Sequence, residues 1–294
     1  MRVFVTGASG HLGSAVVPEL IKAGHEVVGL ARSDASADRL VAAGATVRRG
    51  DLDDLDGLRA AAADADGVIH LAFKHDLMIT GDYAGAVDAD LVAVRALADG
   101  LAGSGKPFVG TSGTAMAAGL GRTATEDDAL PTGPRVDAEN LVIGLDGVRS
   151  SVVRLPPVVH STLDKHGFIP MLIAAARKAG RAGYLGDGAN RWPSVHTLDA
   201  AHLYRLALEG APAGSRLHAV ADEGVPLRRI AEAIGARTGL PVVSVPADEA
   251  QAFFGPAAML TGLDNPATAA RTRELLGWAP VEPGLLDDLD HYFD

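Results

Sequence analysis

Short apolar runs alternate with segments of helical periodicity along the first half of the chain. The apolar runs predict strands at 3–5, 25–30, 45–49, 68–72 and 107–110. The segments between them repeat apolar residues every three or four positions and predict helices over 12–23, 34–43 and 80–101. Such alternation is typical of a parallel sheet with helices on both faces. We therefore predict an α/β fold, a doubly wound parallel sheet of the Rossmann type, with a smaller C-terminal lobe.

The pattern becomes less regular after a predicted helix at 136–145 and a strand at 151–155. Beyond them we predict helices at 168–179 and 225–238, a turn over 184–190 and a short strand at 216–219. The change places a boundary near residue 157. We predict a first domain over 1–157 and a mainly separate lobe over 158–294, from which 192–220 return to the sheet of the first domain.

The first predicted strand leads into a turn with glycines at positions 7, 10 and 13, and then into a helix. Gly7 allows the turn without a Cβ penalty, Gly10 lets a diphosphate approach the backbone, and Gly13 lets the helix pack closely. The helix N-terminus adds N–H donors and a positive dipole end. In this context the spacing predicts dinucleotide binding rather than a ligand-free turn. The predicted loop consists of Thr6, Gly7, Ser9, Gly10, His11, Leu12 and Gly13.

The residues at the end of the second predicted strand indicate which of the two pyridine dinucleotides, NAD(H) or NADP(H), the protein binds. An acidic residue there suits the free ribose 2′-hydroxyl, whereas an arginine suits a 2′-phosphate. Here Arg32 and Ser33 come first and Asp34 follows. We therefore predict NADP(H), in preference to NAD(H), as the cofactor; the alternative for Arg32 is a solvated surface side chain. Further on, Asp51 either accepts a hydrogen bond from the adenine amino group or caps the helix that begins near Asp54.

Composition narrows the classes of partner. The chain has 294 residues, 48% of them apolar, and a formal net charge of −11, which argues against binding to nucleic acid or an anionic membrane. It has no cysteine, and its histidines lack the His-Glu-x-x-His spacing, so we predict no disulfide and no metal site. Apolar runs stay below about 18 residues and the N-terminus lacks a signal-peptide pattern, so we predict a cytoplasmic protein without a membrane span.

These motifs together resemble the extended short-chain dehydrogenase/reductase family, which includes NAD(P)-dependent epimerases and dehydratases. Further segments resemble the family in the same order, at 50–52, 70–72, 154–158, 186–188, 195–200 and 276–280. The resemblance implies a homodimer formed through the helices at 80–101 and 136–145. It also implies that further residues line the cofactor: Asp51, Leu52, Leu71, Ala72, Phe73, Thr111, Pro156, Pro157 and Val158.

One departure from the family concerns its Tyr-x-x-x-Lys pair, the general acid and the lysine that lowers its pKa. With Glu139 as the register mark, Pro131 stands at the tyrosine position and Arg135 at the lysine position. None of the four tyrosines in the chain has a lysine four residues later. Arg135 suits binding to ribose or phosphate, but an arginine pKa above about 12 makes it a poor proton relay. The alternative for Arg135 is a surface residue at a helix end.

Several other side chains are candidates for the missing proton donor. Thr114, or Ser112 in a shifted register, resembles the family's hydroxyl group after the fifth strand; the alternative is a turn that satisfies its own backbone. His160 and His166 follow the Pro156–Pro157 segment, and histidine titrates near neutrality. Tyr184 is a further candidate from the second lobe. With Arg135, these residues make up the predicted catalytic set, although a single histidine more often has a structural role.

The predicted function is that of an NADP(H)-dependent oxidoreductase that reduces a carbonyl-type small molecule. Two alternatives remain at this point. A sugar-nucleotide epimerase or dehydratase would share the fold, although the loss of Tyr-x-x-x-Lys counts against it. A non-catalytic NADP(H)-binding sensor would explain the missing acid, but the intact second lobe with its expected cleft counts against it.

Overall fold

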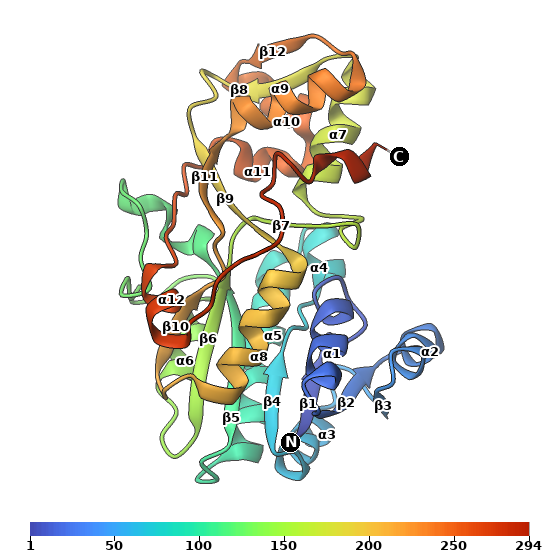
Figure 1. The fold of residues 1–294 in the computed structure, drawn as a ribbon, viewed down its shortest axis with the longest axis vertical. Coiled ribbons are helices and arrows are strands. Elements are labelled where there is room, and N and C mark those ends of the chain that lie inside the picture. Colours follow the sequence, from blue (N-terminus) through green and yellow to red (C-terminus); the bar gives the residue numbers. More distant parts are fainter. Residues whose placement is uncertain (294) are drawn as a thin grey trace.

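A computed structural model describes residues 1–293 of the chain, with a parallel sheet in its lower half and a smaller lobe above (Figure 1). Within these residues the sheet has seven strands, and every neighbouring pair in it is parallel. Its order is β10 (Ser215–His218), β6 (Arg149–Leu155), β5 (Pro107–Gly113), β4 (Gly67–His70), β1 (Arg2–Thr6), β2 (Glu26–Ala31) and β3 (Thr46–Arg49). The predicted doubly wound Rossmann fold is confirmed.

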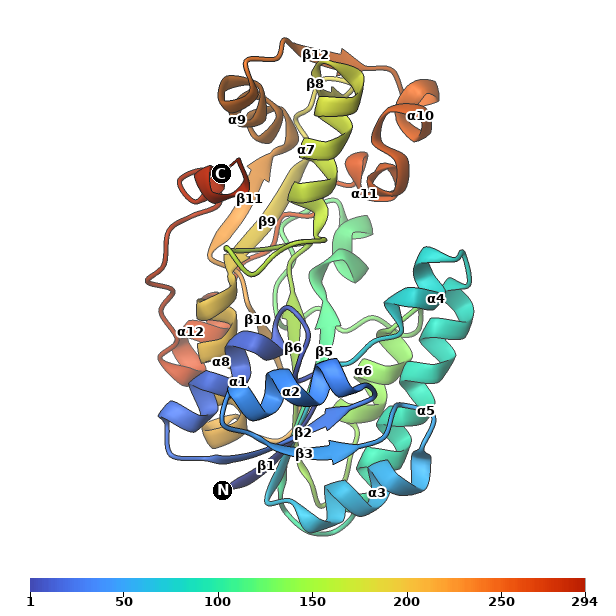
Figure 2. The same cartoon turned by 90° about the vertical axis from the view of Figure 1, so that its right-hand side faces the viewer.

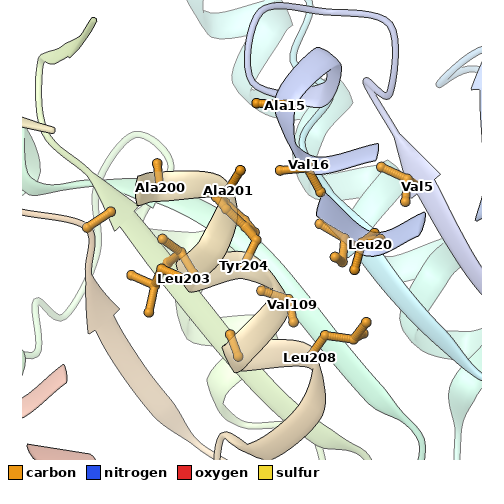
Figure 3. Close-up of a cluster of buried hydrophobic side chains, with 14 of the residues drawn as sticks. Val5, Ala15, Val16, Leu20, Val109, Ala200, Ala201, Leu203, Tyr204 and Leu208 are labelled. Carbon is orange, nitrogen blue, oxygen red and sulfur yellow. The ribbon is translucent and has the colours of Figure 1, made fainter. Parts of the chain in front are cut away.

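Helices cover both faces of this sheet (Figure 2). One face carries α1 (Gly13–Lys22), α2 (Asp34–Ala42), α8 (Thr197–Gly210) and α12 (Ala270–Leu276); the other carries α3 (Leu55–Asp64), α5 (Tyr83–Leu101) and α6 (Val136–Ile143). On the face that carries α1 and α8, buried residues of these two helices pack against each other, among them Val16, Leu20, Tyr204 and Leu208 (Figure 3). Burial of these apolar side chains fixes the two helices on the sheet.

The helix predicted over 80–101 is wrong in its first turn. The structure has a short α4 (His75–Ile79) and then α5, which begins only at Tyr83. Gly81 between them has φ +93°, and the Asp82 carboxylate caps α5 by accepting a hydrogen bond from the Gly85 N–H. None of the helices described in residues 1–293 is long and apolar enough to cross a lipid bilayer.

The second lobe is built on a parallel strand pair, β8 (Ala182–Leu185) and β12 (Val242–Val245). Its core is formed with α7 (Phe168–Ala179), α9 (Leu227–Thr238), α10 (Ala250–Phe254) and α11 (Ala258–Thr261). A small sheet of β7 (Val158–His160), β9 (Arg191–His196) and β11 (Asp222–Pro226) connects it to the lower half. The turn predicted over 184–190 is therefore wrong at its start, because Tyr184 and Leu185 belong to β8.

The chain crosses between its two halves more than once. Within the segment 192–220, α8 and β10 lie with the seven-stranded sheet, whereas β9 lies in the connecting sheet. Residues 270–278 also return, since α12 contacts α8 and β10, and the buried Trp278 donates a hydrogen bond to the Asp199 carbonyl. From there the C-terminal segment runs back up to the second lobe (Figure 1). This second return was not predicted from the sequence.

Candidate functional site

The strand order reverses at β1, which has β4 on one side and β2 on the other. In open α/β sheets ligands bind in the crevice outside the carboxyl ends of the strands at such a point. The glycine-rich turn follows β1, and Leu71 and Ala72 follow β4, so both border this crevice. Thr6 closes one side, because its hydroxyl lies 2.7 Å from Nδ1 of His70 and accepts a hydrogen bond from the Ala72 N–H.

The three glycines of the turn have different surroundings. Gly7 has φ +66°, and a Cβ there would lie 2.7 Å from the backbone nitrogen of Ala72. A Cβ on Gly13 would lie 2.2 Å from the Gly7 carbonyl oxygen, so α1 can start this close to the turn only with glycine. At Gly10 a Cβ would meet only the Gly7 oxygen, at 3.2 Å. The turn therefore has one bare, open position, at Gly10, which a phosphate group fits.

Charged side chains surround the end of β2. Arg32 is exposed, and its guanidinium lies 3.3 Å from the Asp76 carboxylate on α4. Ser33 caps α2 through its hydroxyl, which accepts from the Ser36 N–H. Asp34 is held by Arg49, with 2.5 Å between Nη2 and Oδ1. The nearest acidic side chain that follows Arg32 in the sequence is therefore already paired with a cation.

The structure separates the two roles considered for Asp51. Its carboxylate accepts a hydrogen bond from the Asp53 N–H, whereas the helix cap of α3 is Asp54, which accepts from the Gly57 N–H. Asp51 is exposed and Leu52 is buried beside it. Asp51 is thus not the helix cap, and its side chain remains accessible at the end of β3.

Arg135 has the one positive φ value, +63°, among the non-glycine residues that the structure describes. Its guanidinium lies 4.3 Å from the centre of the Phe73 ring, and Nη2 donates to the Thr111 carbonyl oxygen at 3.0 Å. Nη2 also lies 4.0 Å from the Asp90 carboxylate. Nε of Arg135 is buried without a hydrogen-bond partner in residues 1–293. Strained backbone and an unsatisfied buried donor are both typical of functional sites.

A buried polar chain lies behind Arg135. Asp90 on α5 is 3.1 Å from Nε2 of His70, and both side chains are 2% exposed. Thr111 and Tyr204 share a hydrogen bond of 2.7 Å, and burial raises the pKa of the Tyr204 phenol. Sequence reasoning missed Asp90 and Tyr204. The available signal was a carboxylate at a position of α5 that its apolar neighbours Ala86, Val94 and Leu97 place in the core.

The two hydroxyl candidates are enclosed by protein. Thr114 is fully buried, and its Oγ1 lies 3.0 Å from the amide group of Asn265. With the amide turned so that all its contacts are satisfied, the Thr114 hydroxyl donates to the Asn265 oxygen. Ser112 is also buried and, since side chains alternate along a strand, lies on the opposite face of β5 from Thr111.

The remaining catalytic candidates lie in the connecting sheet and the second lobe. His160 is fully buried, with Nδ1 2.8 Å from Asp288, and its pKa is lowered by burial against the opposing effect of that carboxylate. His166 is exposed in the segment before α7. Tyr184 lies on β8 under the Arg228 guanidinium. The structure thus brings Arg135 together with Phe73 and Thr111, but not with these three residues.

The segment from Pro156 to Val158 completes the predicted set. Pro156 and Pro157 separate β6 from β7, and Val158 is the buried first residue of β7. They lie where the chain leaves the seven-stranded sheet for the second lobe. Among residues 1–293, no group of three or more histidine or acidic side chains is arranged to hold a metal ion.

The sheet topology and the glycine turn at its switch point define a Rossmann-type α/β protein. The model of the NAD dependent epimerase/dehydratase family matches residues 3–137, and the chain belongs to this family. An uncharacterized protein of Schizosaccharomyces pombe is 45% identical to it over 299 residues, which cover 100% of both chains. The relationship therefore extends over the second lobe as well.

One further relative and one solved structure carry descriptions of activity. The 2-alkyl-3-oxoalkanoate reductase of Stenotrophomonas maltophilia is 28% identical over 258 residues, which cover 83% of this chain and 77% of the reductase. The crystal structure of DesIV, a dTDP-glucose 4,6-dehydratase from Streptomyces venezuelae with NAD and TYD bound, has a TM-score of 0.78. At 20% identity, over 100% of this chain and 96% of DesIV, this likeness is one of fold. The relatives thus include a reductase, and the proteins that share the fold include a dehydratase.

Proposed function

We propose that the protein is an NADP(H)-dependent oxidoreductase that reduces a carbonyl group of a small molecule. The observation that carries the proposal is the open position at Gly10 together with Arg32 at the end of β2. The first suits a dinucleotide diphosphate and the second a ribose 2′-phosphate. An exposed ion pair such as Arg32–Asp76 is weak, about 0–1 kcal/mol, so Arg32 is free to exchange Asp76 for a phosphate. The reductase named among the relatives supports the reaction class.

The remaining cofactor contacts are assigned from the position of each residue around the crevice at the carboxyl ends of β1 and β4. We assign the diphosphate to the turn from Gly7 to Gly13, the adenine side to Asp51 and Leu52, and the nicotinamide side to Leu71, Ala72 and Phe73. We also assign to this crevice Thr111, near the end of β5, and the segment Pro156–Val158, after β6. Arg135, with its unsatisfied Nε, is the donor that we assign to the nicotinamide ribose.

The bound dinucleotide supplies a hydride, and the protein must orient the substrate carbonyl and deliver a proton. Arg135 donates hydrogen bonds and stays positively charged, so it polarises a carbonyl oxygen but does not release a proton. Thr114 reaches a substrate only if its bond to Asn265 is exchanged. Ser112, His160, His166 and Tyr184 remain candidates that need a movement of the second lobe or of β5.

Burial of Ser112 and Thr114 favours a second candidate, a protein that binds NADP(H) and responds to it without turnover. The hydroxyls of Ser112, in β5, and of Thr114, directly after it, are both enclosed, and Pro131 stands at the position of the family's tyrosine. A sensor needs the cofactor crevice but no proton donor. The second lobe would then respond to the cofactor instead of holding a substrate.

One set of measurements separates the candidates. Calorimetry with NADPH, NADP⁺, NADH and NAD⁺ tests the cofactor, and NADPH oxidation is followed with a panel of ketones, aldehydes and 3-oxo acids. Tighter binding of NADPH than NADH, with turnover of a carbonyl compound, is the expected result. Tight binding without turnover supports the sensor. Thermal stabilisation by dTDP- or UDP-sugars would instead support an epimerase or dehydratase, and no binding of any dinucleotide would overturn the proposal.

A further inference from the structure

The side chain of His11 connects the glycine-rich turn to the first residue of α8. Its Nε2 lies 2.9 Å from Oγ1 of Thr197, 186 positions further along the chain. Thr197 is fully buried, and it begins the segment that returns from the second lobe to the sheet. A residue of the predicted phosphate loop is therefore in direct contact with the junction between the two halves of the molecule.

The hydrogen bonds of Thr197 determine which nitrogen of His11 carries a proton. Thr197 Oγ1 donates to the His160 carbonyl oxygen at 3.0 Å and accepts from the Ser161 hydroxyl at 2.8 Å. A hydroxyl has a single proton, and that of Thr197 is already used in the bond to His160. Thr197 Oγ1 can therefore only accept a hydrogen bond from His11. Nε2 of His11 must then be the donor. In the neutral ring Nδ1 is the unprotonated nitrogen, and it has no hydrogen-bond partner within residues 1–293.

Charged groups from two segments face His11. Asp164, before α7, favours the protonated ring, whereas His160 on β7 disfavours it. Burial is the largest effect and lowers the pKa of His11, so the free protein holds this imidazole neutral near pH 7. His160 is itself paired with Asp288. Asp164 also accepts from the Gly167 N–H, at the start of α7, and from the Tyr292 hydroxyl.

We propose that His11 takes up a proton at Nδ1 when the diphosphate of a dinucleotide occupies the glycine-rich turn, while Nε2–H remains on Thr197. The inference rests on the proposed function, since it requires a diphosphate at this turn. Two nearby negative phosphates favour the charged imidazolium, and Asp164 stabilises it from the other side. Cofactor binding is then linked to proton uptake. The new positive charge on His11 attracts the carboxylate of Asp164, in the segment before α7.

The experiment is calorimetry of the full-length protein with NADPH and NADH from pH 6 to 8.5, in buffers of different ionisation enthalpy. We expect an uptake of up to one proton per dinucleotide. Between the pKa of His11 in the free protein and that in the complex, Kd should rise with pH by up to tenfold per unit. NADH is included because a phosphate monoester itself titrates near pH 6.

Variants make the assignment specific. His11→Gln keeps an amide N–H for Thr197 but cannot ionise, so it should abolish proton uptake and flatten the pH profile. Thr197→Val removes the acceptor for Nε2–H, so its pH profile should differ from that of the wild type. Thr197→Ser keeps the hydroxyl, and its profile should match that of the wild type. His202→Gln is the matched control, because His202 on α8 lies 3.0 Å from Glu19 on α1, away from the glycine-rich turn. It should behave as the wild type.

Two kinds of outcome would overturn the inference, and they are distinguishable. If the wild type binds dinucleotide without proton uptake, or if His11→Gln binds it with the same uptake as the wild type, the inference fails and the proposed function stands. If the wild type binds no dinucleotide, both fail together. Melting temperatures of all variants show whether a loss of binding is a loss of fold.

Discussion

Glu139 and Arg154 form a buried, bidentate ion pair. Arg154 Nη2 lies 2.5 Å from Oε1 of Glu139 and Nε lies 3.0 Å from Oε2, and each side chain is only 2% exposed. Arg216 adds a third contact, at 2.8 Å from the same Oε1. Burial alone would raise the pKa of Glu139, but the bonds to Arg154 and Arg216 outweigh it and hold that pKa below its usual value. The pair fixes α6, and with it Arg135, against β6.

Replacing Glu139 by Gln should destabilise the protein strongly, by about 3–5 kcal/mol, because Arg154 is left as an uncompensated buried charge. Urea unfolding followed by circular dichroism measures the effect. Glu232→Gln is the control, since Glu232 forms only exposed pairs with Arg228 and Arg229 and should lose less than about 1 kcal/mol. Similar losses for both variants would contradict the role assigned to Glu139.

The glycines at positions 10 and 13 should respond differently to substitution. Gly10→Val fills the open position, so it should abolish NADPH binding while most of the fold survives. Gly13→Ala places a Cβ 2.2 Å from the Gly7 oxygen, a backbone atom, and should lower the melting temperature clearly. Calorimetry and thermal melts check both expectations. NADPH binding by Gly10→Val at wild-type affinity would show that the diphosphate does not lie at this turn.

Replacing Arg32 by Ala should weaken NADPH binding by at least about tenfold, as one charge-assisted phosphate contact contributes about 1.5–3 kcal/mol. NADH binding should hardly change, because NADH lacks the 2′-phosphate. Asp76→Asn is the control: it removes the carboxylate that pairs with Arg32 and should leave NADPH affinity equal or higher. Equal losses for NADPH and NADH in Arg32→Ala would remove the assignment of NADP(H).

Stability should fall as the pH is lowered through about 6.5. Burial lowers the pKa of His160 and of His218 below the ordinary histidine value. The unfolded chain therefore binds protons at pH values where these folded side chains stay neutral, which favours unfolding. The slope is at most about 1.4 kcal/mol per pH unit for each histidine. Urea titrations at pH 7.5, 6.5 and 5.5 measure it, and His160→Gln should be less steep. A constant free energy of unfolding would contradict this expectation.

The protein should sediment as a homodimer. The family resemblance implies this state, with α5 and α6 as the helices at the dimer interface. These two helices lie side by side on one face of the sheet, and Val92 on α5 is 41% exposed. Analytical ultracentrifugation should give twice the chain mass of 30.1 kDa. Val92→Asp should shift the protein toward the monomer. A wild type that remains monomeric at micromolar concentration would refute the predicted dimer.

The strands and the glycine turn were predictable because they depend on local sequence. Apolar runs such as 3–5 and the turn at Gly7 need no knowledge of distant residues. The start of α5 was misplaced because Gly81 and Asp82, both helix-breaking or capping residues, lie within an otherwise helical apolar pattern.

The environment of Arg135 was not predictable in the same way. Its position after Gly133 and Pro134 gave no sign of a left-handed backbone, and its partners Phe73, Asp90 and Thr111 come from three other segments. The return of α12 was missed for a similar reason. Trp278 lies in the segment 276–280 that resembles the family, but the sequence does not indicate which half it packs in. Its burial among residues of α1 and α8 and its contact with Asp199 assign it to the lower core.

The late return of β10, α12 and Trp278 has a consequence for synthesis of the protein on the ribosome. The outer neighbour of β6 lies at Ser215–His218, and the residue that seals the core around α8 lies at position 278 of 294. An emerging N-terminal half would carry an open strand edge at β6 until residues 215–218 have been translated, and exposed edges invite association between chains. Nascent chains of this protein are thus candidates for chaperone protection between the synthesis of β6 and that of Trp278.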